Sequence, residues 1–172
     1  MNYPPDHEGA ITLFKRLQEL DEQNDFGTAE ERYNIIHDLA EAHFYEATDY
    51  FIKGLENSDP DYRWYCISAL ATHWQVKSPD FIQKLLFLAE HDDDIVVRDI
   101  AIDSLGYLSV KEGVSVLRQI IINTQEPLDI RQSASYAFLR TINYINENRG
   151  VNWRNINWIS IAISHLENPN TN

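Results

Sequence analysis

Histidines and carboxylates are the side chains of this chain that could do chemistry, as metal ligands or as general acids and bases. Of six scattered histidines, His37 and His43 stand six residues apart, a spacing that does not share one helical face. His91 precedes the acidic run 92–94, but the oxygen-ligand spacing of a calcium loop is absent. The sequence also lacks G-x-S-x-G, H-E-x-x-H, paired C-x-x-C and a phosphate loop. It therefore predicts no catalytic residue, no metal site and no cofactor, and favours a protein that is not an enzyme.

The composition suits one acidic globular domain. A chain of 172 residues can bury a sizeable core, and 44% hydrophobic with 24% charged residues is an ordinary balance. With 27 acidic and 14 basic residues the net charge is −13. Phosphate binding needs clustered lysine and arginine, so we expect no nucleic-acid partner. A protein partner with a basic surface suits this charge better.

The single cysteine and the N-terminal residues bear on the compartment. Cys66 rules out an intrachain disulfide, and its apolar neighbours predict a small core residue. The first ten residues, MNYPPDHEGA, contain neither the basic nor the apolar region of a signal peptide. No apolar run approaches membrane-spanning length. We therefore expect a cytoplasmic protein without a membrane partner.

An internal repeat explains the acidic run better than a metal site does. Arg63, Arg98 and Arg131 open the similar segments RWYCISALA, RDIAIDSLG and RQSASYAFL. Steps of three and four residues place one stripe on a helical face. Counted from each arginine, the stripe residues are Cys66, Ala101 and Ala134 at +3, Ala69, Ser104 and Ala137 at +6, and Leu70, Leu105 and Phe138 at +7. With a further copy at Arg32 the arginine spacings are 31, 35 and 33, which is the period of a two-helix unit.

Each unit is expected to contain a second helix with its own start signals. The expected apolar stripes are Ile82, Leu85, Leu88 and Ala89 in one unit and Val114, Leu117, Ile120 and Ile121 in the next. Ser78 with Pro79 and Asp59 with Pro60 read as helix starts. Thr28 with Glu31 and Ser109 with Glu112 read as capping boxes, and the acidic run before Arg98 reads as another start.

Two further expectations follow from the alignment of the units. Residues 32–55 align without a gap to 98–121, which predicts a turn within 38–46 although no glycine or proline occurs there. His73 falls at the position of Leu108, so a core or connector histidine is favoured over a metal ligand.

The segment DDDIVVRDIAIDSLGYLSVKEGVSVLRQI resembles HEAT repeats, particularly the short form found in phycobilisome lyases and related proteins. The resemblance covers about residues 28–145. It implies an all-α fold, an α-α superhelix (HEAT-like solenoid) of about four two-helix repeats with capping helices. It also implies a ladder in which an aspartate six residues before each arginine joins neighbouring units. Asp92 precedes Arg98 in this way, whereas Asn57 precedes Arg63 and Gln125 precedes Arg131.

The expected domain organisation is a single HEAT-like repeat domain over 1–172. It has an N-terminal capping helix at 7–22 and repeats at 28–57, 59–91, 92–124 and 126–167. The capping stripe at the N-terminus consists of Ile11, Phe14, Leu17 and Leu20, and a last helix is expected within 153–166. Gly150 and the asparagine-rich residues around it make the loop before that helix, and the tail 168–172 is expected to be disordered.

Candidate binding residues are those whose type departs from their counterparts in other units. Phe87 stands where other units have Lys53 and Gln119, and Leu86 is equivalent to Ile52 and Arg118. The resemblance implies that second helices line the concave, binding face. The residues predicted to bind a partner there are Lys53, Glu56, Phe87, Glu90, Arg118 and Gln119. On the first helices, Trp64 and Tyr136 are aromatic where the equivalent residues are polar, and they form an alternative contact surface.

These observations predict a non-enzymatic scaffold or adaptor that binds a basic protein on its second-helix face. A bacterial immunity-like or antitoxin-like role is one form of that function. The alternative implied by the resemblance is a bilin lyase or isomerase-type subunit handling a phycobilin chromophore. A DNA-alkylation repair role on a HEAT-like fold conflicts with the charge.

Overall fold

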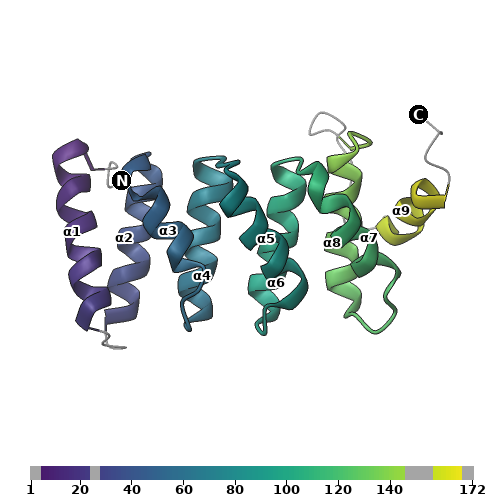
Figure 1. The fold of residues 1–172 in the computed structure, drawn as a ribbon, viewed down its shortest axis with the longest axis horizontal. Coiled ribbons are helices and arrows are strands. Elements are labelled where there is room, and N and C mark those ends of the chain that lie inside the picture. Colours follow the sequence, from purple (N-terminus) through teal and green to yellow (C-terminus); the bar gives the residue numbers. More distant parts are fainter. Residues whose placement is uncertain (1–4, 24–27, 146–156, 168–172) are drawn as a thin grey trace. The chain divides into compact units, whose positions relative to one another are not determined.

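The computed structural model describes residues 5–23, 28–145 and 157–167. Within these ranges the chain forms helices and turns and contains no strand, so the all-α class is confirmed. Contacts divide the chain into two compact units, Met1–Phe81 and Ile82–Asn172. Figure 1 shows the ribbon of both units.

In the first unit, α1 packs against α2, α2 packs against α4 and η3, and α3 packs against α4. The elements are α1 (His7–Gln23), α2 (Ala29–Glu41), the 3-10 turn η2 (Tyr45–Ala47), α3 (Thr48–Gly54), α4 (Pro60–Ile67) and its π-helical continuation η3 (Ser68–His73). Helix α5 (Pro79–His91) begins at the end of this unit.

In the second unit, α8 is the central helix, because α6, α7 and α9 all pack against it and α9 also packs against α7. The elements after α5 are α6 (Ile95–Tyr107), the 3-10 turn η4 (Lys111–Gly113), α7 (Val114–Ile122), α8 (Leu128–Thr141) and α9 (Trp158–Glu167). Residues 153–156 of the expected last helix, the loop around Gly150 and the tail 168–172 lie outside the described residues.

The core follows the repeated stripe predicted from the arginines. The residues at +3, +6 and +7 of all three aligned segments are buried. Small residues matter most where α6 meets α8: a Cβ added to Gly106 would lie 2.5 Å from Ala137 Cα and 2.8 Å from Ala137 Cβ. Glycine and alanine therefore set the close approach of these two helices.

The same turn ends the first helix of each of the four repeats. One residue adopts a left-handed backbone in each turn, namely His43, Gln75, Ser109 and Asn143, with φ between 51° and 59°. In three of the four turns the next residue donates its N–H to a leucine carbonyl five positions back, in the Schellman pattern: Phe44 to Leu39, Val110 to Leu105 and Tyr144 to Leu139. The turn predicted within 38–46 is thus confirmed, since α2 ends at Glu41.

The π-helix η3 changes the register of the second repeat, which begins at α4. Its equivalent bond runs from Val76 N–H to the Leu70 carbonyl, six positions back, because a π-helix inserts one extra residue. As a result Trp74, and not His73, takes the place of Leu108; the two are 7% and 2% exposed. The equivalence of His73 and Leu108 was therefore wrong, and sequence spacing alone does not reveal a π-helical insertion.

Three of the predicted helix starts are confirmed. Asp94 accepts hydrogen bonds from the N–H groups of Val96 and Val97 at 2.8 and 3.1 Å, so the acidic run is a helix cap. Asp59 accepts from the Asp61 N–H in the same way, with Pro60 as the first helical residue. The Ser78 hydroxyl oxygen accepts from the Phe81 N–H at 3.4 Å, where α5 begins.

Both predicted capping boxes were wrong. Thr28 precedes α2, but its hydroxyl accepts from the Arg32 guanidinium instead of a backbone N–H, and Glu31 pairs with Arg16. Ser109 occupies the left-handed turn position, and η4 begins after Val110 without a side-chain cap. A capping box needs an extended residue at the N-cap, and the turn before η4 does not supply one at Ser109.

In the described part of the chain, no helix combines the length and the apolar character needed to cross a bilayer.

Candidate functional site

The repeat arginines donate hydrogen bonds to backbone carbonyl groups at the ends of helices. Arg63 donates to the Asn57 carbonyl at 2.8 Å, which follows α3. Arg98 donates to the Ala89 carbonyl near the end of α5, and Arg131 donates to the Ile121 carbonyl near the end of α7, at 3.3 and 2.9 Å. These bonds satisfy carbonyl groups that a helix end leaves free.

An ion pair between Arg98 and Glu126 joins neighbouring repeats of the second unit. Two parallel hydrogen bonds of 2.9 Å connect the guanidinium to the carboxylate, and both side chains are mostly buried, at 14% and 17% exposed. The ladder implied by the family resemblance placed Gln125 at this position of the next repeat. The next residue, Glu126, forms the contact instead. The six-residue spacing therefore pointed to a position one residue away from the actual partner.

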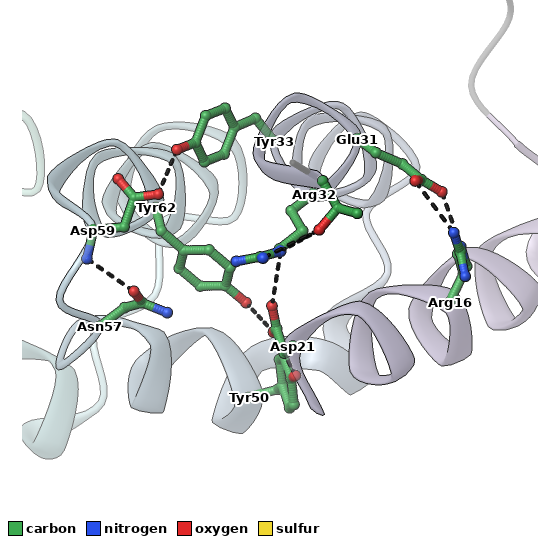
Figure 2. Close-up of polar contacts among 10 residues, drawn as sticks. Arg16, Asp21, Glu31, Arg32, Tyr33, Tyr50, Asn57, Asp59 and Tyr62 are labelled. Carbon is green, nitrogen blue, oxygen red and sulfur yellow. Dashed lines mark hydrogen bonds and ion pairs between the residues drawn. The ribbon is translucent and has the colours of Figure 1, made fainter. Parts of the chain in front are cut away.

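A polar network holds the helices of the first unit together (Figure 2). Asp21, near the end of α1, accepts hydrogen bonds of 2.6 Å from the phenols of Tyr50 in α3 and Tyr62 in α4. Its other oxygen lies 3.7 Å from Nε of Arg32, which is itself buried. Burial, followed by the bond to Asp21, raises the pKa of Tyr50, and burial is also the first cause of the raised pKa of Tyr62. The phenols therefore remain protonated donors, which suits a structural role and not acid–base chemistry.

The predicted second-helix residues are mostly accessible. Phe87 in α5 is 61% exposed and contacts only the His91 ring among the aromatic pairs of the described residues, at 5.0 Å. Arg118 and Gln119 in α7 are exposed, and Glu90 is half-buried. Lys53 and Glu56 are exposed in the first unit, whereas the other four residues belong to the second. Phe87 is therefore not a core side chain.

Trp64 and Tyr136, the aromatic residues of the predicted alternative contact surface, lie in different units. Trp64 lines a hollow of about 330 Å³ in the first unit, together with Ile36, His37, Ala40, Tyr65, Ser68, Ala69 and His73. This hollow was not predicted from the sequence, although Ala40 and Ala69 are small residues on helices that pack together.

Tyr136 lies in the second unit, where its ring is 5.5 Å from the buried Trp158 ring. The Arg140 guanidinium is 5.3 Å from the Tyr107 ring and 5.7 Å from the Tyr136 ring. Tyr136 is thus partly used in packing. Trp64 also contacts a neighbour, with its ring edge to face against Tyr65 at 5.1 Å.

Titratable groups of the described ranges do not gather into a metal-binding cluster. No group of three or more histidine, cysteine, aspartate or glutamate side chains there could hold a metal ion. Cys66 is fully buried, and burial raises its pKa, so its thiol is a core side chain, as predicted. His73 pairs with Glu41 at 3.2 Å, and His37 lies 3.7 Å from Asp38.

The fold and these contacts define an α-helical repeat protein built from two-helix repeats. Each repeat has an arginine in its first helix, buried at Arg32 and Arg63 and partly buried at Arg98 and Arg131. Sequence comparison places it more closely: residues 15–106 match the family of HEAT repeats, and the chain belongs to that family. The same comparisons find no curated protein and no solved structure that matches. HEAT repeats generally mediate protein–protein interaction.

Proposed function

We propose that this protein is a non-enzymatic scaffold or adaptor that binds a protein partner through Phe87 on its second-helix face. The observation that carries the proposal is the 61% exposure of the Phe87 ring. The buried face of α5 includes Phe81, Leu85 and Ala89, which are fully buried, and Phe87 is not part of that face. Since the fold does not need an aromatic ring at position 87, its presence there favours a contact role.

The other residues predicted for the second-helix face are charged or polar, which supports a mixed contact surface. Glu90 lies one helical turn after Phe87 on α5, while Arg118 and Gln119 are exposed on α7. Lys53 and Glu56 are the corresponding exposed residues of the first unit. An apolar anchor with polar groups around it is the usual composition of a protein interface.

The charge distribution supports a basic partner. Residues 1–81 contain 16 acidic and 6 basic residues, a balance of −10, whereas residues 82–172 contain 11 and 8, a balance of −3. A field concentrated in the first unit would accelerate association with a basic protein and would slow it with nucleic acid. Neutralisation of a basic toxin, as in an immunity protein, is one function of this type.

The test compares three baits in affinity capture from native lysate: the wild type, Phe87→Ala and Leu128→Ala. Leu128 is a matched control, because it is 60% exposed at the start of α8. For a partner captured by the wild type, Phe87→Ala should raise the Kd about fivefold or more, while Leu128→Ala should not. If Phe87→Ala binds as the wild type does, the second-helix face is not the contact surface.

A further inference from the structure

We propose that the hollow between α2 and the α4–η3 segment binds a lysine or arginine side chain of the protein partner. This second contact lies in the first unit. It does not depend on Phe87, so its test is independent of the test of the function proposed above. The proposal comes from the shape of the hollow, the aromatic rings at its wall and the carboxylates beside it.

The floor of the hollow suits a slender aliphatic stem. It is formed by Ile36, Ala40 and Ala69, which are all buried. Two alanines where larger side chains could stand leave a recess between the packed helices. The stems of lysine and arginine can lie along such apolar surface while the charged group stays near water.

The wall of the hollow suits a cation. The rings of Trp64 and Tyr65 meet edge to face at 5.1 Å, and Tyr65 stacks on Tyr33 at 5.0 Å with an interplanar angle of 11°. Tyr33 is fixed in turn by its hydrogen bond to Asp59 (Figure 2). Trp64 and Tyr65 are therefore held in place but remain partly exposed, and a guanidinium or ammonium group binds favourably over such ring faces.

The carboxylates lie on the histidine side of the hollow. Glu41 pairs with His73 at 3.2 Å and Asp38 lies 3.7 Å from His37, and both histidines line the hollow. Both carboxylates are about half exposed, so they can accept a further hydrogen bond from a bound cation. Among the described lining residues there is no lysine or arginine. With a balance of −10 in this unit, the electrostatics favour a basic occupant over an acidic or neutral one.

Nuclear magnetic resonance on the whole protein tests this proposal with N-acetyl-arginine N-methylamide as the probe. The indole N–H signal of Trp64 is assigned by its loss in the Trp64→Leu variant. In about 150 mM NaCl this signal should shift as the probe is added, and the shift should saturate at millimolar probe concentration. The citrulline analogue has nearly the same shape without the charge and should bind about fivefold more weakly or worse. Equal binding of both analogues would overturn the proposal, as would an unmoved Trp64 signal.

Variants separate the hollow from general attraction to an acidic surface. Glu41→Gln keeps the size of the side chain and should weaken probe binding about threefold or more, whereas Phe87→Ala should leave it unchanged. The Trp74 indole reports the local fold, because it donates to the Ala40 carbonyl at 3.1 Å in the floor of the hollow. If Glu41→Gln binds the probe as the wild type does while the Trp74 signal is unaltered, the proposal is wrong. A Trp64 signal that moves with protein concentration alone would identify a second copy of the chain as the occupant and would also overturn it.

Discussion

Replacing Gly106 by alanine tests the close approach of α6 and α8 that positions the second unit. The new Cβ would lie 2.5 Å from Ala137 Cα and 2.8 Å from Ala137 Cβ, and the nearest atom is backbone that cannot rotate away. Carbon atoms pack at about 3.5–4.0 Å, so the helices would have to separate locally by about 1 Å or more. Overpacking of this kind costs about 1–3 kcal/mol, and a backbone clash belongs at the upper end.

The gain in helix propensity opposes this loss. Alanine stabilises a helix by about 1 kcal/mol relative to glycine, so the expected net loss in unfolding free energy is about 2 kcal/mol. Urea unfolding followed by far-ultraviolet circular dichroism measures it, with an unchanged slope and a lower midpoint.

Gly113→Ala is the matched control for this variant. A Cβ at Gly113 would be 3.4 Å from Leu105 Cδ2 and 3.6 Å from Leu86 Cδ2, close to ordinary contact with flexible side chains. Gly113→Ala should therefore leave stability unchanged or raise it by up to about 1 kcal/mol. If Gly106→Ala is as stable as the wild type, the close helix approach is not as described.

Three further stability predictions follow. Arg98→Ala leaves the mostly buried Glu126 without its partner and should lower the unfolding free energy by about 1–3 kcal/mol, whereas an unchanged melting temperature would make the pair a solvated one. Asp94→Ala removes the α6 cap and should cost about 1 kcal/mol in the same urea assay; no loss would reduce the cap to a passive contact. Loss of hydration in the protein, followed by repulsion from Asp99, raises the pKa of Asp103 to about 6, above its unfolded value of about 3.9. Ionisation of Asp103 therefore destabilises the fold. This destabilisation is complete above about pH 6 and disappears below about pH 4. Asp103→Asn should therefore raise the melting temperature near pH 7 and not near pH 4, and an equal change at both would contradict the assignment.

The sequence predicted the helical units and their buried faces because each unit repeats the same arginine and small-residue stripe. Cys66, Ala101 and Ala134 are buried as expected, and the acidic run before Arg98 is a helix cap. Such features depend on local spacing along one helix. They can therefore be read without knowing which helices meet.

Features that depend on tertiary packing were missed. The π-helix that moves Trp74 into the place of Leu108 leaves no mark in the spacing of the buried stripe. The partner of Arg98 is Glu126, one residue from the expected position, because the loop before α8 decides which side chain reaches the guanidinium. The hollow beside Trp64 forms only once α2 and α4 lie side by side.

Hydroxyl-radical footprinting of the complex with a captured partner tests the central claim most directly. Phe87, Trp64 and Tyr136 are readily oxidised aromatic residues, so the second-helix face and both aromatic alternatives are followed in one experiment. The account predicts that oxidation of Phe87 slows markedly when the partner is added, because its exposed ring becomes buried at the centre of the contact. An unchanged rate of Phe87 oxidation in a saturated complex would contradict binding through the second-helix face.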